Sequence, residues 1–336
     1  MNWLFTFSTL LPALLPATGI YAQPAPRLPT HTIQLPAELA ERENQFSGLC
    51  TYRGQLLLMS ESRLQEQAEA KVYGLALSDL DQQLAGQVGE LPFRKYAIRG
   101  LADARARIDS AGAIYEGLEG MAMLRDTAYF SVETVTAAPN CYLVRGVLDE
   151  AQNVIRLDSS YLVALPKPLL PNGTPAFNAG FEALASYRHR ELLLLFEYNY
   201  LPRGNHALAL RHRSPRSIAL PPLPFRVTDM VPNGSRRFTA INYFFNGASD
   251  IVYRMAPPDS NARLIQDSTG AYQHYSRLIS LRYRRNRIKW KPLLELPAEY
   301  QTYNWEGLAA YKGGYFLIND KYGPSGLSTL LYLRQR

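Results

Sequence analysis

A short phrase recurs five times along this chain, and it constrains the fold more than any other feature. Each copy has an aromatic or apolar residue, a small or acidic residue and a Gly or Ala, followed by two apolar runs separated by a polar turn. The copies begin at Phe46, Leu118, Phe181, Thr228 and Trp305. Repeats spaced about 50 to 75 residues apart are typical of closed or stacked arrays of small structural units. Because each unit has the pattern of a β-hairpin, the repeat predicts an all-β propeller.

Leu-Pro pairs divide the chain at the same intervals. They occur at 35–36, 91–92, 165–166, 220–221 and 296–297. Proline cannot donate to a sheet ladder, so each pair is expected to end a strand and to begin the crossing to the next sheet. Five phrases and five crossings predict five blades, at about 46–91, 115–165, 180–220, 225–296 and 304–336. No stretch carries a sustained helical period.

The fourth unit is the longest and leaves an alternative open. It contains two candidates for its third strand, Asp250–Met255 and Ser276–Tyr283. Either the region around 256–275 is an insertion, or a sixth blade is present. We favour five blades.

The two ends of the chain share a motif that indicates how the array closes. Leu35-Pro36-Ala37-Glu38 is repeated at 296–299, before a last unit that has only three strands of its own. We therefore expect Thr30–Leu35 to act as its fourth strand and to pair near Thr329–Leu333. Such pairing would leave no open sheet edge.

The N-terminal residues 1–22 are apolar, contain two prolines and end in Tyr21-Ala22, which resembles a secretory signal peptide. We expect an exported monomer whose residues 23–336 form one propeller domain without a membrane span. The net charge of +7 suits acidic or phosphorylated partners, and a basic surface without a partner is an equal alternative. Cys50 and Cys141 fall on different predicted strands, so free buried thiols are expected.

Acidic residues recur at one position of the phrase. The first row consists of Ser47, Glu119, Glu182, Asp229 and Glu306. Counting across each hairpin turn places a second row opposite the first: Glu61, Glu133, Glu197, Tyr243 and Asp320. Both rows should lie on one rim of the propeller and converge on its axis. Like charges opposite one another destabilise a sheet, and burial raises carboxyl pKa values, so this arrangement requires a counter-charge.

A calcium ion would supply that counter-charge, because calcium accepts six to eight hard oxygen ligands. The first row is the expected ligand set, with Ser47 giving a neutral oxygen or holding a water. The alternative is that the acids bind backbone amides and Arg or Lys, with water in the channel. On the same rim, Glu133 or Glu197 is the candidate general base. Candidate substrate-binding residues are Glu61, Arg63, Tyr243, Asp320 and Lys321.

Other chemistries lack their sequence signatures. There is no Gly-x-Ser-x-Gly turn, phosphate-binding glycine loop or dinucleotide fingerprint, and the five histidines show no metal-ligand spacing. Arg188-His189-Arg190 is expected at a turn on the opposite rim. The basic run from Arg282 to Lys289 alternates along a hairpin and is interpreted as a charge-protected sheet edge rather than a nucleic-acid site.

At Glu119-Gly120-Met121, at residues 181–184, at 227–230 and at 305–309, the chain resembles the phytase-like propeller family described as "esterase-like activity of phytase". The resemblance covers about 46–333 and implies an exported propeller. The chain is also similar to the calcium-activated nucleotidases (apyrases), five-bladed propellers with an axial calcium. Ser47, Glu119, Glu182 and Glu306 match their pattern, whereas Asp229 departs from it.

These observations predict a metal-dependent hydrolase of a phosphate or ester substrate, with calcium at an acidic centre. The competing hypothesis, from another functional class, is a non-catalytic binding or scaffold propeller whose central ion only holds the blades together. The fold alone does not distinguish the two, because propellers host many functions.

Overall fold

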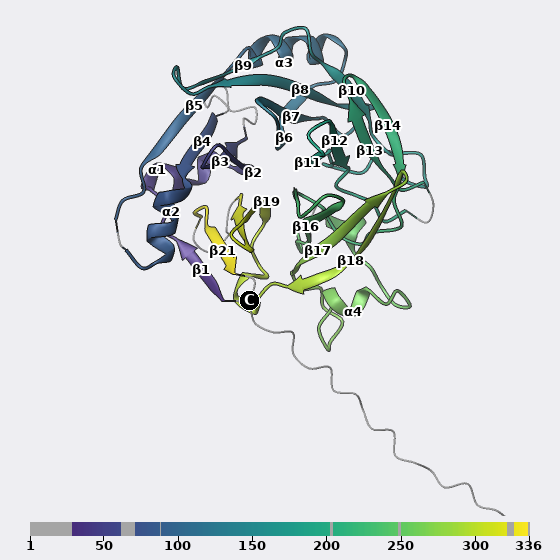
Figure 1. Cartoon of the computed structure of the whole chain (residues 1–336). Helices are drawn as coiled ribbons and strands as arrows, with labels where there is room; N and C mark the ends of the chain where they lie inside the picture. Colours follow the sequence, from purple (N-terminus) through teal and green to yellow (C-terminus); the bar gives the residue numbers. More distant parts are fainter. Residues whose placement is uncertain are drawn as a thin grey trace, which may run out of the picture.

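The strands of this protein are arranged around a common centre (Figure 1). The computed structural model describes residues 29–61, 71–87, 89–201, 204–247, 250–320 and 326–334. The expected signal peptide, Arg63 and Lys321 lie outside the described residues. The predicted all-β class is confirmed, and the arrangement is that of a β-propeller. No described helix has the length and apolar character needed to cross a membrane.

Hydrogen bonds join the described strands into three sheets, and within these sheets we call the five consecutive antiparallel groups units 1 to 5. Parallel pairing of β5 with β9 joins units 1 and 2, and parallel pairing of β14 with β18 joins units 3 and 4. Unit 1 contains β2 (Phe46–Tyr52), β3 (Gln55–Ser60), β4 (Lys71–Ala76) and β5 (Phe93–Arg99). Unit 2 contains β6 (Tyr115–Leu124), β7 (Thr127–Thr134), β8 (Asn140–Asp149), β9 (Val154–Leu157) and β10 (Val163–Pro166). Unit 3 contains β11 (Ala183–Tyr187), β12 (Glu191–Leu195), β13 (His206–Arg211) and β14 (Ser214–Ala219).

Unit 4 contains β15 (Met230–Pro232), β16 (Arg237–Phe244), β17 (Tyr275–Arg284) and β18 (Arg287–Glu295). Unit 5 contains β19 (Trp305–Tyr311), β20 (Gly314–Asn319), β21 (Leu330–Arg334) and β1 (Thr30–Ile33). As the sequence predicted, β1 pairs antiparallel with β21, with Thr30 opposite Leu333 and Ile33 opposite Leu330. The innermost strands contact one another in the cyclic order β2, β6, β11, β15, β19 and back to β2.

Burial decreases from the centre outward, which explains the sequence pattern of each strand. Every residue of β3 and β20 is buried, and both strands are nearly continuous apolar runs because neighbours cover both of their faces. In the outer strand β14, five of the six residues are exposed. Five hydrophobic clusters fill the spaces between neighbouring units. The cluster between units 5 and 1, for example, joins Phe316 and Ile318 to Phe46 and Leu56.

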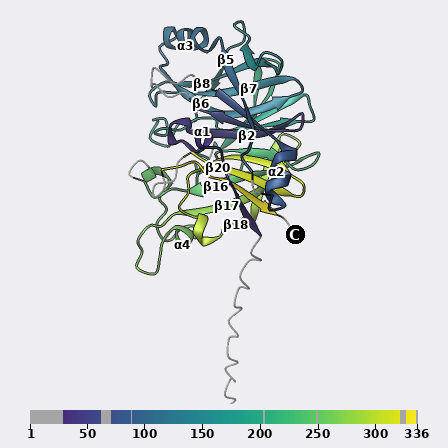
Figure 2. The same cartoon turned by 90° about the vertical axis from the view of Figure 1, so that its left-hand side faces the viewer.

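Helices are more numerous than the sequence suggested. The described segments contain α1 (Ala37–Ala40), α2 (Leu77–Leu84), α3 (Leu101–Ser110), α4 (Ala262–Ile265) and the 3-10 turns η1 (Arg42–Asn44), η2 (Asp250–Tyr253) and η3 (Ala298–Tyr300). The longest, α3, has ten residues and buries only Ile108, so its apolar period is too weak to recognise. Figure 2, which views the disc from its side, shows α3 and α4 toward one face and α2 toward the other.

One expected boundary is wrong, and unit 4 uses the second of its two candidate third strands. Leu91-Pro92 does not mark a crossing, because it precedes β5, the outermost strand of unit 1, and α3 makes the crossing to unit 2. In unit 4 the third strand is β17, and Asp250–Tyr253 forms η2 within a long insertion between β16 and β17. In each unit, the turn between the first and second strands lies on one face, which we call the turn rim, and the connections between the third and fourth strands of units 1 to 4 lie on the same face. The beginnings of the innermost strands and the insertion lie on the other, the carboxylate rim.

Candidate carboxylate site at the centre of the sheets

An extra residue in the innermost strand of each unit fixes the central side chains. The strand register shifts at Ser47 in unit 1, at Glu119 in unit 2 and at Glu306 in unit 5. Such β-bulges leave one residue unpaired in the ladder and re-aim its side chain. In unit 2, Glu133 therefore lies opposite Gly117 rather than Glu119.

Backbone bonds extend the same pattern to the other units. The amide of Glu61 donates to Gln45 O, that of Glu197 to Gly180 O, and that of Asp320 to Asn304 O. The expected opposite pairs Ser47–Glu61, Glu119–Glu133, Glu182–Glu197 and Glu306–Asp320 are therefore wrong by two residues. One residue comes from the count across the turn, since Gly120 already pairs with Ser131 above the bulge, and the other comes from the bulge itself. A residue count across a turn cannot detect an extra residue on one strand.

Unit 4 has the same bulge, and it changes the role of Asp229. Arg226, not Asp229, pairs with Tyr243, and the amide of Ile241 donates to Asp229 O. This register makes Thr228 the counterpart of Glu119 and Glu182. Asp229 takes the place that Gly or Ala has in the other units. Gly120 shows why a small residue is normally needed at this position: a Cβ there would lie 2.2 Å from the carbonyl oxygen of Glu182.

The buried Asp229 carboxylate joins three innermost strands. Its Oδ2 accepts hydrogen bonds from the amides of Leu308 (2.7 Å) and Leu49 (3.3 Å), and Oδ1 accepts one from Met230 (2.7 Å). Burial raises the pKa of Asp229, while these three amides act in the opposite direction. With both oxygens engaged, Asp229 does not fit the predicted role of a metal ligand.

Arg226 supplies a counter-charge of the kind that the alternative to calcium predicts, although the sequence did not point to this residue. Its Nε donates to Asp250 Oδ1 at 2.8 Å, its Nη1 donates to Glu197 Oε1, and its guanidinium lies 4.6 Å from the ring centre of Tyr253. Arg226 occupies the position of Gly117 and Gly180, so an arginine two residues before the unit 4 phrase was the available signal. Asp250 and Tyr253 belong to η2, which lies outside the repeated phrase. The repeat therefore did not predict that they reach the centre.

The carboxylates of the other units gather around this arginine. Glu197 is 0% exposed and Glu119 and Asp320 are 8% exposed, whereas Glu306 is half-buried. Burial raises the pKa of Glu182 well above its usual range, and the neighbouring Glu197, Glu306 and Glu119 raise it further. Glu182 Oε2 is buried and has no hydrogen-bond partner in the described part of the chain.

Glu306 and Glu197 lie in different environments within the same cluster. Burial, Asp320 and Glu197 raise the pKa of Glu306, and the hydroxyl of Tyr243 donates to its Oε1 at 2.9 Å. Burial also raises the pKa of Glu197, but the ion pair with Arg226 opposes that shift. The pKa values of both carboxyls are therefore raised, but unequally: that of Glu182 lies well above its usual range, whereas the Arg226 ion pair limits the rise at Glu197.

Glu61 and Glu133, two further residues of the predicted site, complete the cluster on the side of unit 2. A Cβ placed on Gly117 would lie 2.7 Å from Glu61 Oε1 and 3.1 Å from Glu119 Oε1, so both carboxylates pack against this glycine. Glu133 packs against Gly180 in the same way, at 3.7 Å. Glycine at these positions leaves the space that the acidic side chains occupy.

The predicted calcium ligands are only partly available. Asp229 is engaged by backbone amides, and Ser47 Oγ lies 3.4 Å from Gln45 O as a hydrogen-bond donor. Within the described ranges, no group of three or more His, Cys, Asp or Glu side chains is arranged to hold a metal ion. We therefore derive no chemical step through a metal, and the calcium site stays a prediction.

Both cysteines are free, as expected, but only Cys141 is buried, and Cys50 is half-buried. Cys50 on β2 and Cys141 on β8 are free thiols, and burial raises the pKa of Cys141 to about 12. A thiol with such a pKa is unreactive at neutral pH.

Comparison with known proteins gives no family assignment. No family model matches the chain, and no curated protein matches it. Among solved structures, a glycosyl hydrolase from Bacteroides ovatus has a TM-score of 0.44 and 8% identity, over 90% of this chain and 94% of that one. The GH43_1 enzyme from Xanthomonas citri has a TM-score of 0.45 and 10% identity, over 90% and 89%. A glucose dehydrogenase has a TM-score of 0.43 and 10% identity, over 92% and 100%. Similarity at this level carries no argument about activity.

Proposed function

We propose that this chain is a five-bladed β-propeller, closed by the β1–β21 pairing, that acts as a hydrolase through its central carboxylates. The observation that carries the proposal is the pair of contrasting carboxyls, Glu182 and Glu197, beside Arg226. Two titratable groups whose surroundings push their pKa values apart are the usual basis of acid–base catalysis. The phytase-like resemblance with an esterase label agrees with this proposal.

In the proposed reaction, water attacks an ester carbonyl while Glu197 accepts a proton from that water. The ion pair with Arg226 opposes the rise in the pKa of Glu197 and so favours its ionised form over that of Glu182. Glu182 then donates its proton to the departing alkoxide, which leaves as an alcohol. After the reaction Glu197 carries a proton and Glu182 does not. Proton exchange with solvent water then restores the starting protonation states.

The charge of the cluster favours a neutral substrate. In the described cluster, the carboxylates Glu119, Glu182, Glu197 and Glu306 face one arginine, Arg226. A phosphate dianion placed among them would be repelled, whereas a carboxylic ester or lactone would not. Of the two expected substrate classes, the ester is therefore the one we propose.

Removing either proton-transfer group should abolish most of the activity. We expect Glu182→Gln and Glu197→Gln to lower kcat/KM for ester hydrolysis about 10² to 10⁴-fold, the usual contribution of a general acid or base. The assay uses small carboxyl esters, lactones and phosphoesters at fixed pH. Because Glu182 must carry a proton, the wild-type rate should also fall as the pH rises through its raised pKa.

The matched control is Glu191→Gln, a half-buried glutamate at the start of β12 that lies away from the cluster. It should hydrolyse esters at the wild-type rate. Absence of turnover on every substrate in the wild-type protein would reject the hydrolase and leave the non-catalytic scaffold. An equal loss of kcat/KM in Glu191→Gln would show that the effect does not come from removing a proton-transfer group.

Calcium at the centre is a second candidate, favoured by the buried Glu182 Oε2 among three carboxylates. If it binds the folded state alone, saturation at 100 times its dissociation constant adds about 2.7 kcal/mol of stability. Chelator should then lower the melting temperature, added calcium should restore it, and Glu182→Gln should weaken that rescue. A melting temperature that is insensitive to both additions would remove calcium from the proposal.

A further inference from the structure

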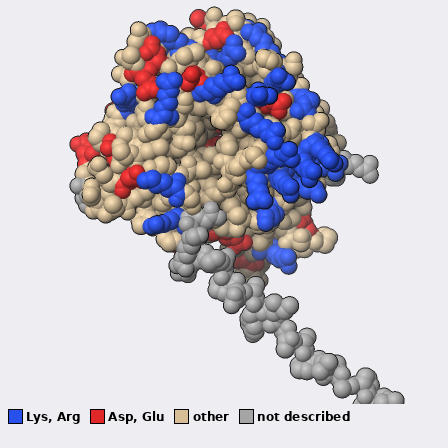
Figure 3. Space-filling model, viewed as in Figure 1, with Lys and Arg blue, Asp and Glu red and all other residues tan. Residues whose placement is uncertain are grey.

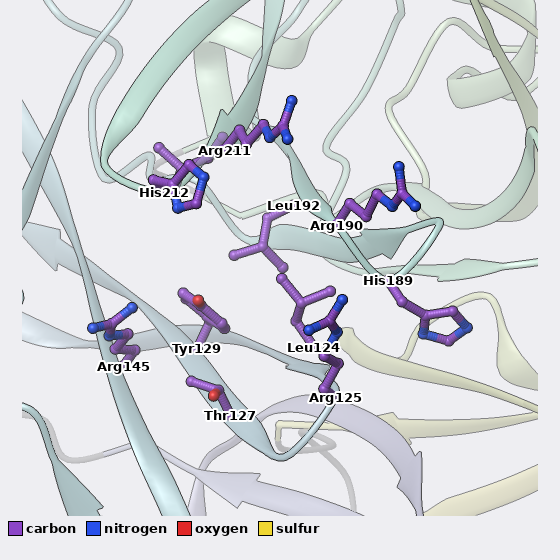
Figure 4. Close-up of a pocket in the computed structure, with 11 residues that line it drawn as sticks. Leu124, Arg125, Thr127, Tyr129, Arg145, His189, Arg190, Leu192, Arg211 and His212 are labelled. Atoms are coloured by element: carbon purple, nitrogen blue, oxygen red, sulfur yellow. The ribbon is translucent and has the colours of Figure 1, made fainter.

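A second site lies on the turn rim, between units 2 and 3. It is a pocket of about 490 Å³, within the range of small-molecule sites. Its cationic and titratable lining consists of Arg125, Arg145, Arg190, Arg211, His189 and His212. In Figure 4 the arginines surround Leu192, Leu124 and Tyr129, which lie between them.

The positive charge of this pocket is largely uncompensated. Arg145 is paired with Asp158, with Nη2 to Oδ2 at 2.8 Å, and its guanidinium stacks 4.3 Å from the ring centre of Tyr161. Across the described ranges, no acidic side chain is ion-paired with Arg125, Arg190 or Arg211. No acidic residue lines the pocket either. Several like charges held together without partners favour the binding of an anion.

Three of the lining residues have a backbone conformation that is energetically unfavourable for most side chains. Arg125, His189 and His212 have φ angles of 58°, 52° and 59°, in the left-handed region that turns usually fill with Gly, Asn or Asp. Each lies in a hairpin turn between well-formed strands, so the strands determine where the side chain points. The pocket is therefore built from fixed elements rather than from a long loop.

An apolar hollow adjoins the basic pocket. It measures about 370 Å³, opens at the turn-rim end of the innermost strands, and shares Arg125 and His189 with the basic pocket. Its apolar lining includes Met121, Met123 and Met230. Methionine side chains adapt to apolar groups of different shapes.

We infer that the two hollows together bind an organic phosphate, with the phosphate among the arginines and an apolar substituent over the methionines. Guanidinium groups match phosphate oxygens with paired hydrogen bonds, and a dianion can engage several at once. The site lies about 20 Å along β6 from Glu119, so it does not depend on the proposed hydrolytic function.

This site is distinct from the broader basic surface of the same face. Figure 3 shows Lys and Arg gathered on the face seen in Figure 1, including the β17–β18 hairpin with Arg282, Arg284, Arg285, Arg287 and Lys289. In that hairpin Arg284 lies opposite Arg287, and Arg282 lies opposite Lys289. The hairpin therefore provides a control of similar charge that lacks the apolar neighbour.

The test is calorimetric titration of the full-length protein with hexyl phosphate, inorganic phosphate and hexanol. We expect saturable binding of hexyl phosphate, several-fold weaker binding of inorganic phosphate and no binding of hexanol. Arg190→Gln/Arg211→Gln should weaken hexyl phosphate binding by at least about tenfold, because two charge-assisted contacts are lost. Arg284→Gln/Arg285→Gln, with the same loss of charge, should bind like the wild type.

Three results would overturn the inference. The first is no saturable binding of hexyl phosphate. The second is an equal loss in the Arg284/Arg285 variant, which would indicate attraction by overall charge. The third is equal affinity for hexyl phosphate and inorganic phosphate, which would remove the apolar hollow from the site. Melting curves of both double variants identify any loss of folding before the titrations are compared.

Discussion

Replacing Arg226 with Met will lower the free energy of unfolding by about 3 to 5 kcal/mol, the usual cost of removing one partner from a buried ion pair. The guanidinium is paired with Glu197 and Asp250, and both carboxylates are buried. Without Arg226 these acids must ionise without a partner or take up protons. Urea denaturation at neutral pH gives the difference directly.

A second substitution separates this electrostatic effect from a loss of packing. Adding Glu197→Gln to Arg226→Met removes one of the uncompensated charges, so the double variant should be more stable than the sum of the single changes predicts. Arg284→Met, an exposed arginine in β17, should stay within about 0.5 kcal/mol of the wild type. A loss below about 1 kcal/mol for Arg226→Met would mean that water or another cation neutralises the acids.

Asp229→Ala is expected to cost at least about 3 kcal/mol, because each buried amide left without an acceptor costs about 1 to 3 kcal/mol. The substitution leaves the amides of Leu49, Met230 and Leu308 without their acceptor in the buried centre. Three innermost strands lose their shared contact at once. Urea unfolding and amide hydrogen exchange at these three positions both report the loss.

Two comparisons make the Asp229 result specific. Asp229→Asn keeps an acceptor oxygen and should lose less stability than the alanine variant. Asp126→Ala removes an aspartate whose side chain is 69% exposed and pairs with Arg53, so it should cost at most about 1 kcal/mol. Equal stability of the two alanine variants would show that water replaces the Asp229 carboxylate.

The sequence predicted what depends on regular repetition. The repeated phrase located the innermost strand of each unit, and the repeated Leu-Pro-Ala-Glu motif located the partner of β1. The convergence of Glu119, Glu182 and Glu306 followed from their common position in the phrase. Each of these inferences needed only the period of a strand and the geometry of a hairpin.

What the sequence could not predict arises where a unit departs from the repeat. The bulges at Ser47, Glu119 and Glu306 change the register by one residue without any change in strand composition. In unit 4 the aspartate of the phrase is displaced by one position and becomes a structural group. The counter-charge Arg226 and its partner Asp250 come from outside the repeated phrase, so a comparison of repeats alone assigns the neutralising role to a metal.

The pairing of β1 with β21 also governs when this protein can finish folding. Unit 5 joins strands that lie about 300 residues apart in the chain, so it cannot form until synthesis has passed β21. Until then the apolar surface between units 5 and 1, including Phe46 and Leu56, has no cover. Contacts of such long range form slowly and expose partly folded chains to aggregation. A chain of this design is therefore most vulnerable just before its last strand is added, and a chaperone that binds β1 or unit 1 would protect it at that stage.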